Sequence, residues 1–190
     1  MTKCIHILYR SSTVITLLRF DLSIIAGQAT ACVELIEDGF RDHEVVFDTV
    51  LAPVGGGGLL SGTALATTYL SPATKVVACE PSGADDAFRS FKSGDFVPSV
   101  KPNTIADGLL TSLGDKTWPI IRDHVDDVLT VQEETIVQMM KFVWQRMKIV
   151  IEASSAVPLA AILENRSLFE GKKVGVIISG GNVDFDRLPW

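Results

Sequence analysis

The spacing at which apolar residues recur changes several times along this chain. β-branched apolar runs, typical of buried strands, alternate with stretches in which apolar residues recur every three or four positions, which is typical of helices. From these periods we predict helices over residues 28–37, 59–70, 85–93, 118–124, 133–147 and 154–164, and strands over residues 45–54, 75–79, 127–131 and 173–178. Residues 95–117 contain prolines and glycines without a clear period and are expected to form a loop.

Strands that alternate with helices through short links predict an α/β fold. The expected architecture is a parallel twisted sheet covered by helices on both faces. The mean hydropathy of +0.30 suits a sheet that is buried on both sides. A length of 190 residues is enough for one domain or for half of a two-domain enzyme.

Composition excludes several classes of protein. With 17 basic and 23 acidic residues the net charge is −6, so a general nucleic-acid binder is not expected. No uncharged apolar run is long enough to span a membrane, and the N-terminal segment lacks the features of a signal peptide. The three cysteines are widely spaced, which favours a cytoplasmic, reduced protein in which Cys32 and Cys79 are buried.

Four consecutive glycines, Gly55, Gly56, Gly57 and Gly58, lie between a predicted strand and a predicted helix. Without side chains their N–H groups can turn toward one anion, and the N-terminus of the next helix adds a positive dipole, so a phosphate is the expected ligand. A tight turn without a ligand is the alternative. A Walker loop is excluded because no lysine follows before Ser71.

A dinucleotide-binding loop is a further alternative. The first glycines fit its pattern, although Leu60 stands where the third glycine belongs. Glu80 follows Gly58 by 22 residues, near the position of an acid that binds a ribose.

Five motifs occur together in a fixed order, at residues 25–30, 53–59, 80–86, 104–108 and 179–184. They read Ile-Ala-Gly-Gln-Ala-Thr, Pro-Val-Gly-Gly-Gly-Gly-Leu, Glu-Pro-Ser-Gly-Ala-Asp-Asp, Thr-Ile-Ala-Asp-Gly and Ser-Gly-Gly-Asn-Val-Asp. This set resembles the second half of the fold-type II pyridoxal-phosphate enzymes, and most of all the serine racemase and serine/threonine dehydratase family. The resemblance divides the chain into a non-family segment, residues 1–23, and a large cofactor-phosphate domain of the tryptophan synthase β type, residues 24–190.

The resemblance implies a cofactor site and a cation site. Gly55 to Gly58, with Leu59, would hold the phosphate of pyridoxal phosphate, and Ser179 would bind the pyridine nitrogen; from the residues alone, Ser179 could be a turn residue. Glu80, Ala84 and Asp86 match a site for Mg²⁺, Ca²⁺ or Mn²⁺, and their oxygens suit hard cations. The alternative is that Asp85 and Asp86 cap a helix.

The resemblance also implies sites at other positions. It associates Asp48 with a cation, although a solvated strand residue is the alternative, and Lys148 and Asn182 with ATP as an activator, although Lys148 could be a surface lysine. Glu152 would lie near the cofactor. Two motifs depart from the family pattern: Ala29 replaces a glycine, so a left-handed backbone there would be strained, and Glu152-Ala-Ser-Ser replaces Glu-Pro-Ser/Thr-Gly/Ala.

No lysine of this chain stands in the segment that carries the family's Schiff-base lysine, so a catalytic residue is not assigned. The resemblance implies a pyridoxal-phosphate-dependent serine racemase with L-serine and L-threonine ammonia-lyase activity in the full-length, homodimeric member. Such an enzyme would act on small amino acids and serve D-serine synthesis, and this chain is expected to be a truncated form, inactive alone. The alternative is a non-catalytic module that binds phosphate or a cation, or that regulates a partner.

Overall fold

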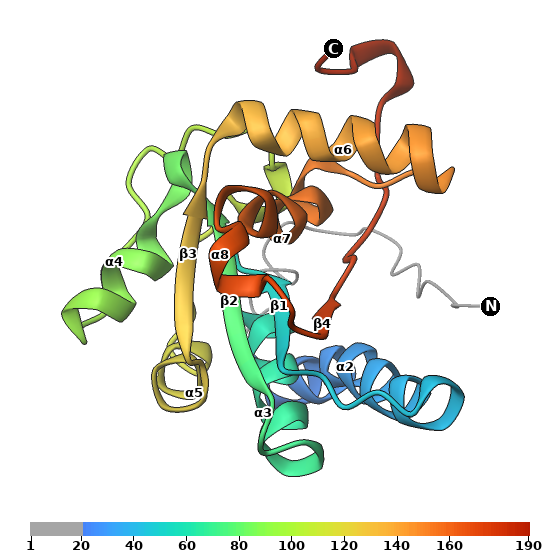
Figure 1. The fold of residues 1–190 in the computed structure, drawn as a ribbon. Helices are drawn as coiled ribbons and strands as arrows, with labels where there is room; N and C mark the ends of the chain where they lie inside the picture. The colour runs from blue at the N-terminus through green and yellow to red at the C-terminus, as the bar shows by residue number, and fades with distance from the viewer. Residues whose placement is uncertain (1–20) are drawn as a thin grey trace.

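The computed structural model describes residues 21–190, and its centre is a four-stranded parallel sheet in the order β3-β2-β1-β4 (Figure 1). The strands are β1 (Thr49–Pro53), β2 (Lys75–Pro81), β3 (Asp127–Val131) and β4 (Val174–Val176). All three strand pairs are parallel. The predicted α/β fold with a parallel sheet is therefore confirmed.

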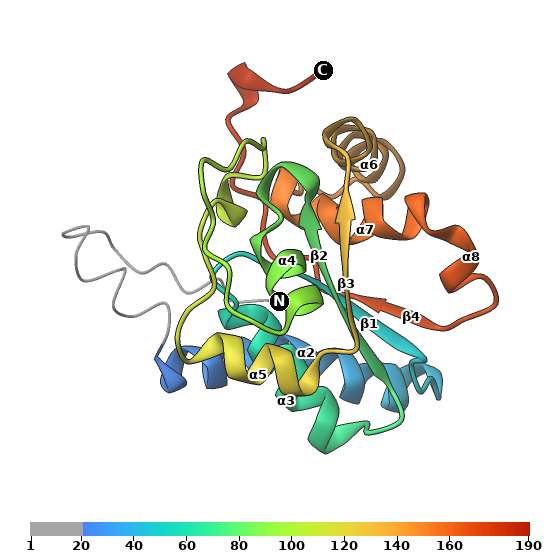
Figure 2. The same ribbon diagram turned by 90° about the vertical axis from the view of Figure 1, so that its left-hand side faces the viewer.

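Helices cover both faces of this sheet (Figure 2). On one side lie α2 (Leu22–His43), α3 (Gly58–Leu70), α4 (Asp86–Ser93) and α5 (Thr117–His124). On the other side lie α6 (Glu133–Met147), α7 (Ala153–Glu164) and the short α8 (Arg166–Phe169). The described residues also form three short 3-10 helices, η1 (Ser82–Ala84), η2 (Asp107–Leu109) and η3 (Phe185–Arg187). Within residues 21–190, no helix is long and apolar enough to cross a membrane.

The strands contribute to two hydrophobic cores. Val50 and Ala52 face the core under α2, α3 and α5, whereas Leu51 faces the core under α6 and α7. The same alternation places Val77 and Cys79 in the second core. Because successive side chains of a strand point to opposite faces, a sheet that is covered on both sides requires continuous apolar strands. This explains the high mean hydropathy.

Helix α2 is much longer than the helix predicted over residues 28–37. It begins after Asp21, whose carboxylate accepts a hydrogen bond from the N–H of Ser23 at 2.8 Å, and it ends where Glu44 adopts a left-handed conformation. The predicted end at residue 37 is wrong, because the helix continues to His43 and the following glycine, Gly39, is buried inside it. The strand predicted over residues 45–54 is shorter than expected, since only Thr49–Pro53 pairs with neighbours.

Ala29 carries no left-handed strain, because it lies within α2 and its φ is not positive. Close packing of α2 on α3 depends here on Gly62 of α3, because a Cβ on Gly62 would lie 2.5 Å from the backbone nitrogen of Ala29. The two helices therefore touch through their backbones. The predicted burial of Cys32 and Cys79 is confirmed.

The order of the strands reverses at β1. From β1 the chain passes through α3 to β2 on one side, while β4 lies on the other side of β1. Ligands of open α/β sheets bind beyond the carboxyl ends of the strands at such a reversal. The glycine loop follows β1 and Ser179 follows β4, so the topology brings together two segments that are far apart in sequence.

Candidate functional site

A cavity of about 230 Å³ lies at the carboxyl ends of β1 and β4. Its wall is formed by the glycine loop, the 3-10 turn η2, the start of α7 and the segment after β4. The lining residues are Pro53, Gly55, Gly56, Gly57, Gly58, Leu59, Leu60, Gly108, Leu109, Glu152, Ser154 and Ser179. All six residues predicted to bind the cofactor therefore line one cavity, which we call the cradle.

The backbone of the glycine loop presents unpaired donors. Among the residues that the structure describes, none accepts a hydrogen bond from the N–H groups of Gly55 to Leu60. The first paired amide of this segment is that of Ser61, which donates to the carbonyl of Gly57 at 2.8 Å. Unpaired N–H groups at the start of a helix, together with the helix dipole, form a site for an anion such as phosphate.

Thr117 of α5 holds this loop in shape, and no sequence pattern pointed to it. Its hydroxyl donates to the carbonyl of Gly56 at 2.8 Å, and it accepts from the N–H of Gly114 at 2.8 Å. Gly57 adopts φ +87°, and a Cβ there would lie 2.7 Å from the Thr117 hydroxyl oxygen. No other residue type fits this position without a shift of the loop.

The polar end of the cradle contains Ser179 and Glu152. The Ser179 hydroxyl lies 3.1 Å from the hydroxyl of Ser155, and the carboxylate of Glu152 accepts from the N–H of Asn182 at 2.9 Å. Burial raises the pKa of Glu152. The hydrogen bond from Asn182 opposes this rise, and the charge of Asp107 adds to it. Glu152 is the one ionisable side chain among the lining residues, so backbone amides dominate the electrostatics of the cradle.

Glu80 and Asp86 lie near each other at the end of β2. The carboxylate of Glu80 is buried and accepts hydrogen bonds from the N–H groups of Ala87, at 3.3 Å, and Phe88, at 2.5 Å. Burial raises the pKa of Glu80 to about 8; the bond from Phe88 opposes this rise, and the charge of Asp86 adds to it. Asp86 is also buried, burial raises its pKa, and within residues 21–190 its Oδ2 atom has no hydrogen-bond partner.

Asp85 and Asp86 lie at the start of α4, where the helix dipole favours acidic residues: Asp85 directly precedes the helix and Asp86 is its first residue. The carboxylate of Asp85 makes no capping hydrogen bond and pairs instead with Arg89 at 2.8 Å, because the next helical turn brings that guanidinium within reach. Glu80 takes the capping role from the preceding strand. Since Glu80 is 1% exposed and does not line the cradle, it is not presented to a ribose there. This removes the main support for a dinucleotide-binding loop.

Asp48 and Glu80 lie at opposite ends of the neighbouring parallel strands β1 and β2. The carboxylate of Asp48 accepts from the N–H of Lys173 at 2.7 Å, at the amino end of β1, whereas Glu80 is near the carboxyl end of β2. The two carboxylates therefore do not share one site. Over residues 21–190, no group of three or more His, Cys, Asp or Glu side chains is placed to hold a metal ion, so a cation would rely on two carboxylates, a carbonyl and water.

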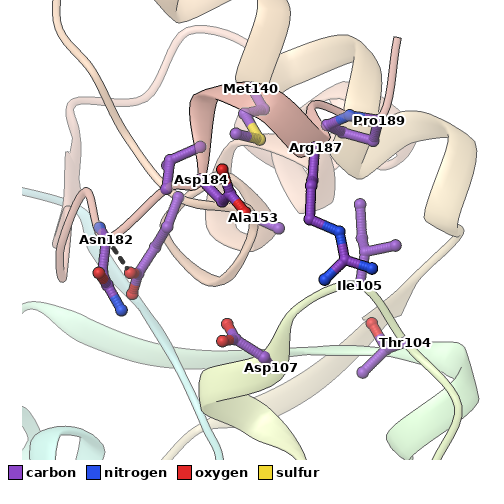
Figure 3. A pocket seen from close by; sticks show the side chains of 11 residues that line it. Thr104, Ile105, Asp107, Met140, Ala153, Asn182, Asp184, Arg187 and Pro189 are labelled. Atoms are coloured by element: carbon purple, nitrogen blue, oxygen red, sulfur yellow. Dashed lines mark hydrogen bonds between the residues drawn. The ribbon is translucent and has the colours of Figure 1, made fainter.

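A second, larger cavity of about 680 Å³ adjoins the cradle at Glu152. In Figure 3 the side chains of Asp107 and Arg187 enter it from opposite sides. Of the two residues expected to contact ATP, Asn182 lines this cavity and Lys148 does not. Lys148 instead ends α6 in a left-handed conformation, with φ +60°.

Comparisons with known proteins agree with this geometry. The family model described as pyridoxal-phosphate dependent enzyme matches residues 9–180, and the match begins inside the segment that the motifs leave outside the family. The division at residue 23 stays a prediction. The chain is 51% identical over 172 residues to a β-hydroxyaspartate dehydratase of Paracoccus denitrificans, and 52% identical over 172 residues to a serine racemase of Dictyostelium discoideum.

These alignments cover 90% and 88% of this chain, and 52% of each relative, so the chain spans about half the length of the curated relatives that it matches. Among solved structures, a threonine deaminase from T.th. superposes with a TM-score of 0.83 at 45% identity, over 87% of this chain and 61% of that structure. The fold and the family match lead to the same conclusion: the chain belongs to the fold-type II family of pyridoxal-phosphate dependent enzymes.

Proposed function

We propose that the chain is the cofactor-phosphate domain of an enzyme that racemises or deaminates small β-hydroxy amino acids such as serine and threonine. The observation that carries this proposal is the segment from Gly55 to Leu60: its six N–H groups have no acceptor among residues 21–190, and its residues line a cavity together with Ser179. The relatives support the substrate class, because serine, threonine and β-hydroxyaspartate, which their names mention, share a hydroxyl at the β-carbon.

In this proposal the protein binds and orients the cofactor, pyridoxal phosphate, which supplies an electron sink for the Cα carbon of the substrate. The amides of the glycine loop hold the phosphate, and Thr117 fixes their direction through Gly56. Ser179 offers a hydroxyl to the ring nitrogen. Because a hydroxyl is a weaker partner than a carboxylate, it favours an unprotonated nitrogen. The half-buried Glu152, whose pKa burial raises, is the one ionisable side chain that lines the cradle.

The test is a calorimetric titration of the chain with pyridoxine 5′-phosphate, which lacks the aldehyde and binds without a covalent bond. We expect it to bind more tightly than inorganic phosphate, because the ring also contacts the cavity. Equal affinities would favour a non-catalytic phosphate-binding module, and no binding would overturn the proposal. Release of ammonia and formation of D-serine from L-serine and L-threonine, assayed with pyridoxal phosphate, then test the reaction itself.

We also propose that Glu80, Asp86 and the carbonyl of Ala84 bind a divalent cation such as Mg²⁺, Ca²⁺ or Mn²⁺. Support comes from the Oδ2 atom of Asp86, which is buried without a partner among residues 21–190, and from the raised pKa values of both carboxyl groups. A cation would neutralise these charges and satisfy that oxygen. Asp48 lies at the other end of the strands from Glu80 and Asp86, so it cannot join this cation site and could bind a cation only at a separate one.

ATP is proposed as a ligand of the larger cavity. Asn182 and the guanidinium of Arg187 line a volume of about 680 Å³, and Arg187 forms no ion pair within the part of the chain that the structure describes. Lys148 does not line this cavity, so its proposed contact would depend on a ligand that extends past it. Measured binding of ATP that is lost in Asn182→Ala and retained in Lys148→Ala would support this arrangement.

A further inference from the structure

Ser155 of α7 lies beside Ser179 at the polar end of the cradle. It is fully buried, and its hydroxyl oxygen is 3.1 Å from that of Ser179. The N–H of Gly180 donates to the Ser155 hydroxyl at 2.7 Å, and the same hydroxyl donates to the carbonyl of Gly180 at 2.7 Å. Within the described residues, Ser155 is the one hydrogen-bond partner of the Ser179 side chain. Ser155 stands where the sequence pattern led us to expect glycine or alanine.

The number of protons at this cluster limits how it can be arranged. An amide N–H only donates, so the Ser155 oxygen accepts from Gly180. The single proton of Ser155 goes to the Gly180 carbonyl in this structure and can turn to Ser179 instead. The Gly180 carbonyl also accepts a hydrogen bond from the N–H of Glu152 at 3.1 Å. That carbonyl therefore stays paired when the Ser155 proton turns to Ser179. In this arrangement Ser179 accepts from Ser155, and its own proton is free to point into the cradle.

We propose that Ser155 is a positioning residue that makes Ser179 a hydrogen-bond donor toward the ring nitrogen of a phosphorylated pyridine cofactor. The inference rests on the proposed function. Hydrogen bonds in a row polarise one another, so the chain from Gly180 N–H through Ser155 strengthens Ser179 as a donor. A stronger donor favours the unprotonated nitrogen. Ser155 thus lowers the pKa of the bound ring nitrogen, although it does not touch the ring.

The experiment uses pyridoxine 5′-phosphate as the probe and follows two quantities: its dissociation constant, and the pH dependence of the ultraviolet absorption of the bound ring, which reports protonation of the ring nitrogen. For Ser155→Ala we expect a dissociation constant raised by about 2- to 10-fold and a higher pKa of the ring nitrogen. Ser179→Ala should have the same effects. The double variant should resemble Ser179→Ala alone, because Ser155 acts through Ser179.

Ser90→Ala is the matched control. Ser90 is another fully buried helix serine, and its hydroxyl likewise bridges backbone groups, with the Asp86 carbonyl at 2.7 Å and the Val97 N–H at 2.9 Å. It lies outside the cradle. This variant should lower the melting temperature as Ser155→Ala does, but leave the dissociation constant and the ring titration unchanged. A change in either would mean that loss of stability, not loss of the Ser155 hydroxyl, explains the result.

Three outcomes would overturn the inference. If the unsubstituted chain binds the probe and Ser155→Ala changes neither quantity, Ser155 has no positioning role and the proposed function still stands. Additive effects of Ser155→Ala and Ser179→Ala would show that Ser155 does not act through Ser179. If the unsubstituted chain does not bind the probe, the proposed function fails and the inference with it. Should Ser155→Ala unfold, Ser155→Cys fills nearly the same space with a much weaker donor and gives the same comparison.

Discussion

Replacement of Glu80 by glutamine changes how the stability of the protein depends on pH. The Glu80 carboxyl is 1% exposed and has a pKa of about 8, against an ordinary value of 4.5, mainly because burial disfavours its charged form. In the unfolded chain the same group titrates near 4.5. Glutamine stays neutral at every pH and its side-chain oxygen can still accept from the amides at the start of α4.

The sign follows from the protons that each state binds. Between pH 4.5 and 8 the folded protein keeps the proton on Glu80 and the unfolded chain has lost it, so stability falls as pH rises through this window. Each pH unit costs about 1.4 kcal/mol, which makes the whole effect on the order of 5 kcal/mol. Below this window the loss vanishes because both states are protonated. The Glu80→Gln variant does not suffer this loss and should be the more stable protein at pH 8.

The assay is urea unfolding of both proteins at several pH values from 4.5 to 8.5, without divalent cations and then with Mg²⁺ or Ca²⁺. Without cations, the free energy of unfolding should decline with pH more steeply for the unsubstituted chain than for Glu80→Gln. At pH 8 the cation should stabilise the unsubstituted chain and leave the variant unchanged. Glu37→Gln, which removes an exposed carboxylate, is the control. Parallel pH profiles of Glu80→Gln and the unsubstituted chain would refute the reasoning about burial, and equal cation responses would refute the cation site.

Three further predictions concern the cradle and the surface. Gly57→Ala should abolish binding of pyridoxine 5′-phosphate and lower the melting temperature. Gly94→Ala is the control: Gly94 has φ +80° and no atom within 4 Å of an added Cβ, so this variant should lose only about 1 kcal/mol of stability from backbone strain and keep binding. Equal losses of binding in the two variants, measured by calorimetry, would contradict this. Among residues 21–190 no lysine lines the cradle, so borohydride should fix pyridoxal phosphate to no single lysine. One stoichiometric adduct in peptide mapping would disprove this. Phe40, Tyr69 and Leu70, exposed by 64%, 78% and 51%, should make the isolated chain bind a hydrophobic dye and self-associate, which a monodisperse monomer with low dye binding would contradict.

Local sequence patterns predicted most of the fold. The helix expected over residues 133–147 and the strand expected over 127–131 have the observed bounds, because apolar periodicity reports which face of an element is buried. The glycine loop between a strand and a helix was recognisable for the same reason, since its neighbours in sequence supply both the free amides and the dipole. The length of α2 was not predictable, because Gly39, a usual helix end, is buried inside it.

Only the tertiary structure decided how the candidate site is built. Ser155 meets Ser179 across 24 residues of sequence, and Thr117 reaches the glycine loop across 61. Glu80 became the cap of α4 and acquired its raised pKa through burial, while Asp48 was placed at the opposite end of the strands. Hydrogen-bond partners and burial depend on which strands lie side by side and in which register. Composition, motifs and spacing along the chain do not contain that information, because packing of the whole sheet and its helices determines it.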